Sequence, residues 1–481
     1  MRLVRLTAIL GIAATSAAFR AGAHEVNAWP AVVLQEDSAG QTQSWSALGP
    51  FFFSGQSPGP DAGHESGFRP LFTQASGGGC VRTDLLYPLF YYRKYSDGYK
   101  WSLLELINGQ GTDADATKAG GPTDRQFDLW PFYFSRETAD PAATYHALLP
   151  VYGTIKYRLG YDRVFWAPFP LYVQTEKGGK KVTYAPFPFI RFSSGKENGF
   201  GIWPLFGSTS GPGPARHFFL AWPLFWDNTV EPGPDAPEGT APGTQFGFLP
   251  FYTREKDPGS ISENYIWPFF GYTERTAPYR YSERRYFWPF LVQGKGDDRL
   301  LERWGPFYTH SDIKGTESTW VGWPLWHQTT WVDADIRQTK TQFFYFVYWS
   351  MEEESVSRPA AAHAYKRHIW PILSIWDNGA GSRQVQFPSP MDVFFSGNSD
   401  MPVVWTPLFS LYRYDHRPTG ETRTSVLWGA LTWRRDAANE LVEFHLGPLI
   451  GVHRHPGGTA LTLLGFDFGG KQGKGEEAKR Q

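Results

Sequence analysis

Few residues in this chain have the types and spacing needed for chemistry, and the first candidate is His24. It follows Ala21-Gly22-Ala23, a small-residue motif of the kind at which export signals are cleaved. If cleavage occurs there, the terminal amine and the imidazole of His24 could together chelate a copper ion. That arrangement needs a second histidine, which the repeated sequence does not visibly supply. We therefore interpret His24 as a chain terminus rather than as a metal site.

A second candidate is the pair His453 and His455 in Val452-His453-Arg454-His455-Pro456. Alternate residues of a strand lie on the same face, so the two imidazoles could bind one metal ion. Two ligands are too few for a stable site, and a solvated turn is the simpler interpretation.

Acidic pairs could offer oxygen ligands to calcium in loops. Asp113 with Asp115 and Asp333 with Asp335 have this spacing, but neither pair belongs to a complete series of ligands. The sequence contains no phosphate-binding glycine loop, nucleophile elbow or zinc-ligand cluster. We therefore predict that the protein is not an enzyme and has no cofactor or metal.

A row of tryptophans suggests binding rather than catalysis. These tryptophans directly precede prolines at regular intervals: Trp130, Trp203, Trp222, Trp267, Trp288, Trp323 and Trp370. If the row faces solvent, it forms a platform on which sugars or other flat ligands could stack. Otherwise the indoles form a structural belt that fills a core or faces lipid, because burial of so much aromatic surface is favourable.

The elements that position this row form an internal repeat. A short apolar word with a central proline recurs from Pro30 to Pro448, mostly every 18 to 20 residues. Three gaps of double length each contain a proline-free apolar run, which brings the total to about 22 units. A last apolar stretch, 461–468, adds one more. Such a period means that one supersecondary unit is used again and again.

Each apolar run is rich in aromatic and β-branched residues and is bounded by polar turns such as Lys177-Gly178-Gly179-Lys180. That pattern predicts one strand per repeat and an antiparallel up-and-down meander of about 22 strands. The proline would then lie in mid-strand, and a belt of bulges would curve the sheet towards closure. A parallel β-solenoid is the competing fold, but only one dense apolar run appears in each repeat.

Connection lengths indicate two different sides of the sheet. The three longest connections, 110–125, 227–243 and 351–367, all follow odd-numbered units. In an up-and-down meander they emerge on the same side, with short turns on the other side.

Composition limits the class of partner. The 46 basic and 47 acidic residues give a net charge of −1 without a basic stripe, which argues against nucleic acid as a partner.

The chain divides into three segments. Residues 1–23 have the pattern of a signal peptide, and we expect 24–468 to form one β-repeat domain and 469–481 to form a polar tail. The single cysteine, Cys80, cannot form an internal disulfide and is interpreted as an unpaired thiol in a glycine-rich turn.

Together these features resemble large bacterial outer-membrane β-barrels. The chain is also similar to uncharacterised exported bacterial proteins built from Trp-Pro-Leu-Phe repeats, as at 203–206 and 222–225. The resemblance implies a closed barrel in the outer membrane, lipid as a partner, and a structural, pore or transport role. The expected strands are apolar on both faces at mid-height, whereas the strands of a water-filled barrel have one polar face. A soluble or surface-attached envelope protein that binds glycans or other proteins therefore stays open as an alternative. A metal-dependent secreted enzyme would instead require copper at His24.

Overall fold

The structure is a computed structural model that describes residues 24–37, 41–56, 63–112, 124–232, 239–393, 401–455, 458–464 and 466–468. Its 44 described strands belong to one antiparallel sheet in which strands adjacent in sequence pair with each other. The predicted all-β class and the up-and-down meander are therefore confirmed. The described chain separates into two compact units, 1–78 with 372–481 (unit 1) and 79–371 (unit 2).

The strand number predicted from the sequence was wrong by a factor of about two, because each repeat is a hairpin. In one repeat, β19 (Asn198–Ile202) leads through the turn 203–205 into β20 (Phe206–Ser210). The register pairs Ile202 with Phe206 directly beside this turn. The 44 described strands thus form 22 successive hairpins, and a repeat of 18 to 20 residues holds two strands and two connections.

The prolines lie in these turns and not in mid-strand, so the expected belt of bulges is wrong. Trp203-Pro204 and Trp222-Pro223 are cis peptide bonds, as are the X-Pro bonds in most of the other repeats. A cis proline belongs to the type VI turn, and a proline has no N–H to donate to a ladder. Neighbouring turns are also joined, because the Trp222 N–H donates to the carbonyl oxygen of Pro204 at 2.7 Å.

The sheet is not closed, so the expected barrel is also wrong. Strand β1 (His24–Ala28) pairs with β2 (Val32–Glu36), and β44 (Phe466–Phe468) pairs with β43 (Gly458–Leu463). None of the pairings between described strands joins β1 to β44. The expectation of closure depended on curvature from mid-strand prolines, and these prolines lie at the strand ends.

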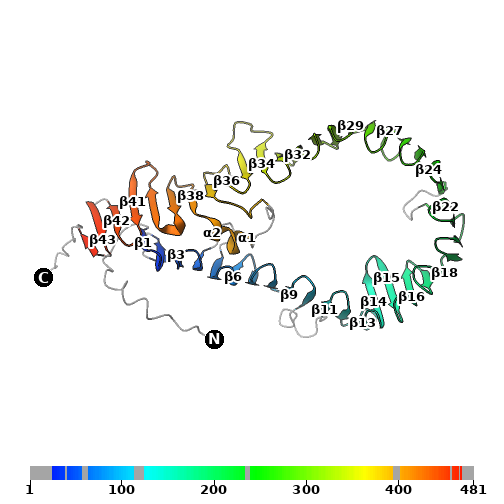
Figure 1. Ribbon diagram of the computed structural model, residues 1–481, viewed down its shortest axis with the longest axis horizontal. Coiled ribbons are helices and arrows are strands. Elements are labelled where there is room, and N and C mark those ends of the chain that lie inside the picture. Colours follow the sequence, from blue (N-terminus) through cyan, green and yellow to red (C-terminus); the bar gives the residue numbers. More distant parts are fainter. Residues whose placement is uncertain are drawn as a thin grey trace, which may run out of the picture. The chain divides into compact units, whose positions relative to one another are not determined.

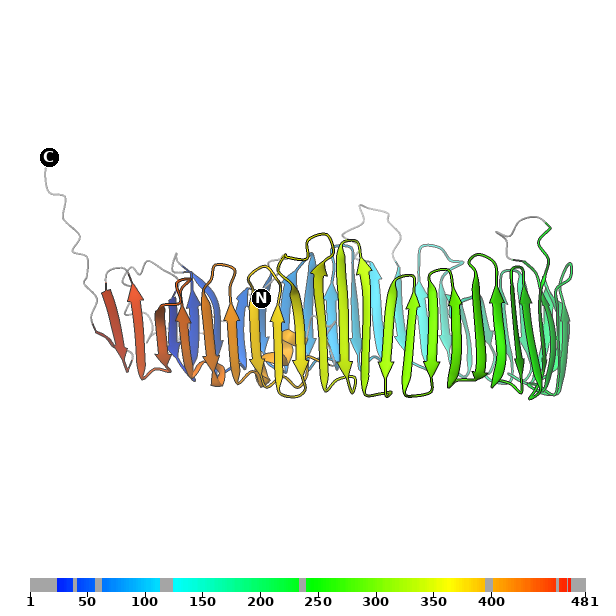
Figure 2. The same cartoon turned by 90° about the horizontal axis from the view of Figure 1, so that it is seen from above.

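Unit 2 is a single layer of strands that lie side by side (Figures 1 and 2). Its strands are β7 (Cys80–Leu85), β8 (Phe90–Lys94), β9 (Gly98–Leu103), β10 (Ile107–Thr112), β11 (Arg125–Leu129), β12 (Tyr133–Glu137), β13 (Tyr145–Leu148), β14 (Tyr152–Arg158), β15 (Tyr161–Trp166), β16 (Val173–Lys177), β17 (Lys180–Tyr184), β18 (Ile190–Gly195), β19, β20, β21 (Arg216–Leu220), β22 (Phe225–Val230), β23 (Gly243–Phe248), β24 (Tyr252–Asp257), β25 (Ser260–Tyr265), β26 (Phe270–Arg275), β27 (Tyr281–Phe287), β28 (Leu291–Gly296), β29 (Arg299–Trp304), β30 (Tyr308–Ile313), β31 (Thr316–Val321), β32 (Trp326–Asp333), β33 (Ile336–Phe343), β34 (Tyr348–Ser355) and β35 (Ala364–Ile369).

The connections of unit 2 lie along two edges of this layer (Figure 2). Turns within a hairpin lie at one edge, and connections between hairpins lie at the other. The three long connections predicted to share a side join β10 to β11, β22 to β23 and β34 to β35, so all three leave from the second edge. Residues 113–123 and 233–238 of these connections lie outside the described residues.

A single layer has little interior, and unit 2 stabilises itself largely through cross-strand pairs. Its buried cluster is small and comprises Tyr145, Ala147, Ile155, Trp166 and Val173 on β13 to β16. Elsewhere an aromatic ring covers a glycine on the adjacent strand, as in the cross-strand pairs Trp101 with Gly109, Phe219 with Gly207 and Trp226 with Gly247. Such pairs fix the register, because only glycine leaves room for the ring.

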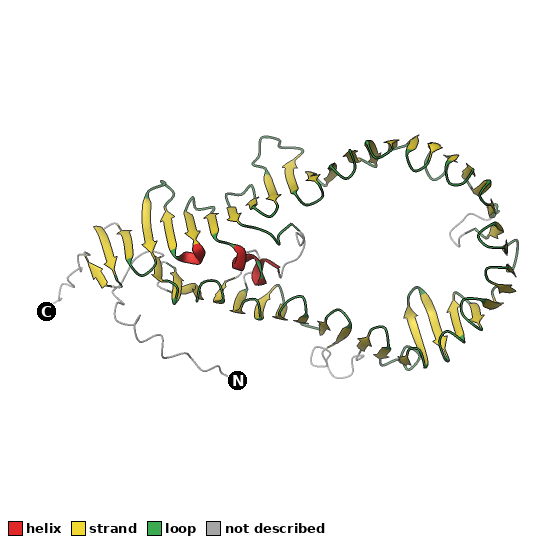
Figure 3. Ribbon diagram, in the orientation of Figure 1, coloured by secondary structure: helices red, strands yellow, loops and turns green. Residues whose placement is uncertain are grey.

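Unit 1 has two layers, formed by its N-terminal and C-terminal strands (Figures 1 and 3). Its remaining elements are β3 (Thr42–Ala47), β4 (Phe52–Gln56), β5 (His64–Phe68), β6 (Phe72–Gly77), β36 (Leu373–Asp377), β37 (Arg383–Phe387), α1 (Met401–Val404), α2 (Thr406–Phe409), β38 (Tyr412–His416), β39 (Thr422–Val426), the 3₁₀ turn η1 (Leu427–Gly429), β40 (Leu431–Arg435), β41 (Leu441–Leu446) and β42 (Ile450–His455).

Polar side chains join the two layers of unit 1. The buried carboxylate of Glu25 on β1 accepts hydrogen bonds from Arg423 Nε at 2.9 Å and from Thr432 Oγ1 at 2.7 Å. The buried side chain of Arg69, just beyond β5, donates to the carbonyl oxygen of Val403 in α1 at 2.5 Å. Glu25 is thus paired with the Arg423 charge, and Arg69 donates a second hydrogen bond to the carbonyl oxygen of Pro50 at 3.0 Å, so both buried charges have polar partners.

We expect the ring-over-glycine pairs to control the register of unit 2. A Cβ at Gly247 would lie 2.2 Å from the Trp226 indole, so Gly247→Val should destabilise β22 to β24 by about 1–3 kcal/mol. Hydrogen–deuterium exchange of β22 to β24 in the full chain measures this as loss of protection. In a Trp226→Ala background, Gly247→Val should cost clearly less. Equal costs in both backgrounds would contradict the pairing.

Candidate interface: the aromatic edge

The within-hairpin connections of unit 2 form an apolar edge of the sheet, which we call the aromatic edge. It consists of the turns 86–89, 104–106, 130–132, 149–151, 167–172, 185–189, 203–205, 221–224, 249–251, 266–269, 288–290, 305–307, 322–325 and 344–347. Glu105 is the only charged residue in these turns. Large apolar side chains are exposed there, including Leu205 at 60% and Phe307 at 75%. A soluble monomer rarely shows a continuous apolar surface of this extent.

The structure brings six of the seven predicted tryptophans to this edge, whereas Trp370 follows β35 and lies outside these turns. All seven tryptophans precede a cis proline, and all except the partly exposed Trp370 are clearly exposed. Trp203 and Trp222 lie on adjacent turns with their ring centroids 6.0 Å apart and their planes tilted by 47°. Trp323 donates from Nε1 to the hydroxyl of Tyr345 on the next turn at 3.0 Å. Trp203 and Trp222 are therefore neighbouring, mutually tilted rings, whereas turns without tryptophan separate Trp130 from Trp203 and Trp222 from Trp267.

Polarity changes along strand β27 away from the aromatic edge, because Tyr286 and Phe287 near the edge are followed inward by Arg285, Arg284 and Glu283. The Arg285 guanidinium is largely buried and donates to Glu283, to the Tyr272 carbonyl and to other strand oxygens. The apolar part of the strand is thus limited to its last one or two residues.

The opposite edge, which we call the polar edge, is formed by the connections between hairpins. Asp335 lies there, and its carboxylate accepts hydrogen bonds from Ser355 Oγ and from the Ser357 hydroxyl and N–H. The Ser357 hydrogen bond is the main cause that lowers the pKa of Asp335. The carboxylate therefore stabilises a loop, and Asp333 is an exposed end residue of β32. Asp113 and Asp115 lie outside the described residues.

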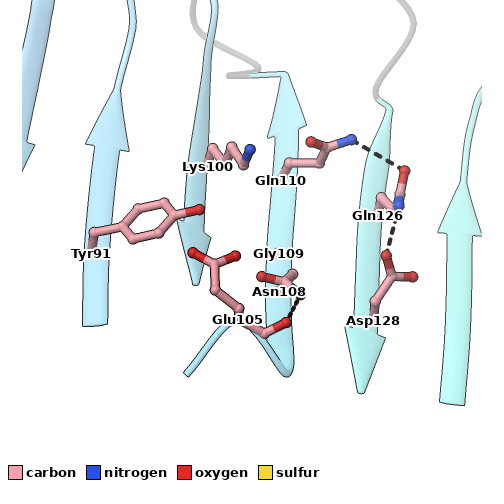
Figure 4. A pocket seen from close by; sticks show the side chains of 8 residues that line it. All are labelled: Tyr91, Lys100, Glu105, Asn108, Gly109, Gln110, Gln126 and Asp128. Carbon is pink, nitrogen blue, oxygen red and sulfur yellow. Dashed lines mark hydrogen bonds between the residues drawn. The ribbon is translucent and has the colours of Figure 1, made fainter. Parts of the chain in front are cut away.

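Unit 2 also has a shallow polar pocket on β8 to β11 (Figure 4). Gln110 Nε2 donates to Gln126 Oε1 at 3.1 Å, and Gln126 Nε2 donates to Asp128 Oδ2 at 2.8 Å. Asp128 is held in turn by both guanidinium nitrogens of Arg158, at 2.8 and 2.9 Å. Burial, followed by the nearby Glu105 carboxylate, raises the pKa of the Tyr91 phenol. The lining groups mainly satisfy one another.

His24 and His453 were treated separately in the sequence and are close together in unit 1. Their ring centroids lie 5.6 Å apart. The side chain of His455 lies outside the described part of the chain, so the predicted pair with His453 is not tested. Cys80 begins β7 as a partly exposed free thiol.

Sequence reasoning missed Glu443 and His445, which lie beside His453 in unit 1. The only local signal was the alternation Glu443-Phe444-His445, which places the two polar side chains on one face of a strand. Their proximity to His453 depends on the pairing of β41 with β42.

No protein-family model matches this chain, and no curated protein matches it. Within the described residues, no helix is both long enough and apolar enough to cross a membrane. The expected absence of enzymatic activity stays a prediction.

His327 on β32 is the histidine of unit 2 with a clear electrostatic environment. Its ring stacks on Trp320 with centroids 3.8 Å apart, and Gln342 Oε1 lies 3.3 Å from its Nδ1. Burial lowers the pKa of His327, although the Gln342 hydrogen bond raises it in part. The folded protein therefore favours the neutral ring.

We expect an NMR titration to give His327 a pKa below 6.5. Because the unfolded chain would take up this proton first, the contribution of His327 to stability should be lost as the pH falls below 6.5. Trp320→Ala exposes the ring and should raise the His327 pKa towards that value. The His327 resonance is identified as the one that is missing from the spectrum of the His327→Asn variant. A pKa above 6.5, or one unaffected by Trp320→Ala, would contradict this.

Proposed function

We propose that the chain is a membrane-associated β-repeat protein of the cell envelope with a structural role, and that its aromatic edge inserts into one leaflet of a lipid bilayer. The observation that carries this proposal is the line of exposed, almost uncharged aromatic turns along one edge of unit 2. The export signal expected in residues 1–23 supports a location outside the cytoplasm.

The composition of the edge fits a membrane surface. Tryptophan and tyrosine favour the boundary between lipid and water, because one end of the ring system is apolar and the other forms hydrogen bonds. The edge combines these residues with phenylalanine and leucine, as in the turns 266–269 and 322–325. Glu105 is the single carboxylate that would need to stay near the headgroups.

The depth of the apolar zone fits partial insertion. Two strand residues extend roughly 7 Å, and interfacial elements bury about 5–10 Å of their apolar face. Beyond this depth β27 carries Arg285, Arg284 and Glu283, whose charges would be costly to place in the apolar part of a bilayer.

Strand length argues for a surface role rather than the pore or transport role considered from the sequence. Strands of unit 2 have 4 to 8 residues, whereas a spanning β-strand needs about 9–11. An outer-membrane location remains compatible with the proposal, since one leaflet is enough for the edge.

A second candidate function is stacking of glycans on the exposed indoles. Six of the seven tryptophans share the aromatic edge, which is the observation that favours it. A 47° tilt between Trp203 and Trp222 disfavours a flat platform, however, and the apolar neighbours Leu205 and Leu224 offer sugars no hydrogen bonds. Lipid is therefore the better-supported partner.

Removal of three edge tryptophans should weaken membrane binding. We expect the variant Trp203→Ser/Trp222→Ser/Trp267→Ser to bind lipid vesicles at least tenfold more weakly than the natural chain. Each exposed indole would contribute about 1–2 kcal/mol on leaving water. Co-sedimentation of the full chain with vesicles of zwitterionic and anionic phospholipid gives the partition coefficient.

The matched control lies on the polar edge, where Tyr157 and Leu159 are 64% and 80% exposed. Tyr157→Ser/Leu159→Ser should leave vesicle binding unchanged.

A second measurement uses the natural chain. Lipids brominated near the headgroup should quench its tryptophan fluorescence more strongly than lipids brominated near the end of the acyl chain. Equal loss of binding in both variants would refute the role of the aromatic edge. Resistance to carbonate and urea, together with a migration shift on boiling, would favour a spanning barrel. Binding to oligosaccharides without binding to vesicles would favour the glycan function.

A further inference from the structure

Three side chains with metal-ligand chemistry meet in unit 1, far from the aromatic edge in sequence. Glu443 and His445 on β41 and His453 on β42 each offer one ligand atom, and these atoms lie within 4.8 Å of one another. We propose that Glu443, His445 and His453 bind a zinc-type divalent ion between the layers of unit 1, with His24 of the facing layer as the fourth ligand. The inference is independent of membrane binding.

Strand register brings these residues together. Glu443 pairs directly with His453, and His445 pairs with Gly451, so the three side chains share one face of the hairpin. A Cβ at position 451 would lie 3.2 Å from His445 Nδ1, and glycine therefore leaves space beside the ring. The hairpin thus presents two imidazoles and a carboxylate to the facing layer.

An independent sign of a missing partner is the state of His445. The residue is only 5% exposed, and its Nε2 atom has no hydrogen-bond partner. An unsatisfied buried polar atom costs about 1–3 kcal/mol, so a partner for this nitrogen is expected.

Both carboxylate oxygens of Glu443 have polar partners. Its Oε1 lies 3.1 Å from His453 Nδ1 and accepts the Glu25 N–H at 2.8 Å, and its Oε2 lies 3.0 Å from Arg434 Nε. Binding of an ion to Oε2 would therefore require Glu443 to give up the Arg434 contact. Oε1 could stay on Nδ1 of His453, which leaves Nε2 of that ring to face the ion.

His24 extends the cluster from β1 in the other layer. Its ring centroid lies 5.6 Å from that of His453, and its Nδ1 lies 3.1 Å from Glu36 Oε2. Three imidazoles and one carboxylate favour zinc over calcium or magnesium, which take oxygen ligands. Ligand atoms of a tetrahedral zinc site are separated by roughly 3.3 Å. The ligand atoms of Glu443, His445 and His453, which lie within 4.8 Å of one another, would therefore need to approach by about 1–2 Å. His24 would need to turn from Glu36 towards them.

The test is calorimetric titration of Zn²⁺ into the chelator-treated full chain at neutral pH. We expect one ion per chain and a higher melting temperature with zinc, because the ion joins both layers. His445→Gln, His453→Gln and His24→Gln should each lower zinc affinity at least tenfold. The matched control is His146→Gln in unit 2, whose exposed ring contacts the Tyr133 hydroxyl at 3.1 Å and should leave binding unchanged.

A second measurement uses the natural chain alone and does not depend on the folding of variants. Co²⁺ at this site should give the intense visible absorption of a tetrahedral complex, and Zn²⁺ should abolish it. Absence of stoichiometric zinc binding, or an octahedral cobalt spectrum, would overturn the site. Equal affinity in the His445→Gln, His453→Gln and His146→Gln chains would also overturn it. Unchanged affinity in His24→Gln alone would remove His24 from the ligand set.

Discussion

Most features of this structure depend on one constraint, which is the position of the proline word at the turn of every hairpin. Proline cannot donate to the ladder, so it is excluded from the paired part of a strand and defines where pairing stops. Because Trp203-Pro204 and Trp222-Pro223 close successive hairpins, their apolar neighbours lie at the same height. Repetition of the turn then produces a continuous apolar edge, which no single hairpin could have.

Much of the fold could be predicted from the sequence because the repeat is regular. The period and the antiparallel order followed from the regular interval between the prolines. The shared side of the long connections followed because all three come after odd-numbered units. Strand identity did not, because an aromatic run such as 266–269 has the composition of a strand and forms a turn. The true strands are more polar, for example Thr316–Val321, and their pairing depends on both neighbours. Closure was inferred from the same misplaced prolines.

The two candidate sites differ in how far they are encoded locally. The tryptophan row could be found from sequence, since each Trp-Pro is part of the repeat, but its exposure could not. The cluster around His445 could not be found, because His24 and His453 are distant in sequence and meet only through the layers of unit 1. Local spacing pointed instead to His455, a neighbour two residues along the same strand.

The aromatic edge also follows from the thinness of unit 2. A single layer buries few apolar side chains on its faces, and beyond the small cluster on β13 to β16 many strand positions carry hydroxyls, amides and paired charges such as Arg158 with Asp128. Unit 1 can bury Val33 and Val404 between two layers, and there the charged groups cross between layers instead. Large apolar side chains of unit 2 remain at the turns, where a strand ends and no neighbour covers them. On the proposed function, a lipid surface would supply the apolar contact that a second layer supplies in unit 1.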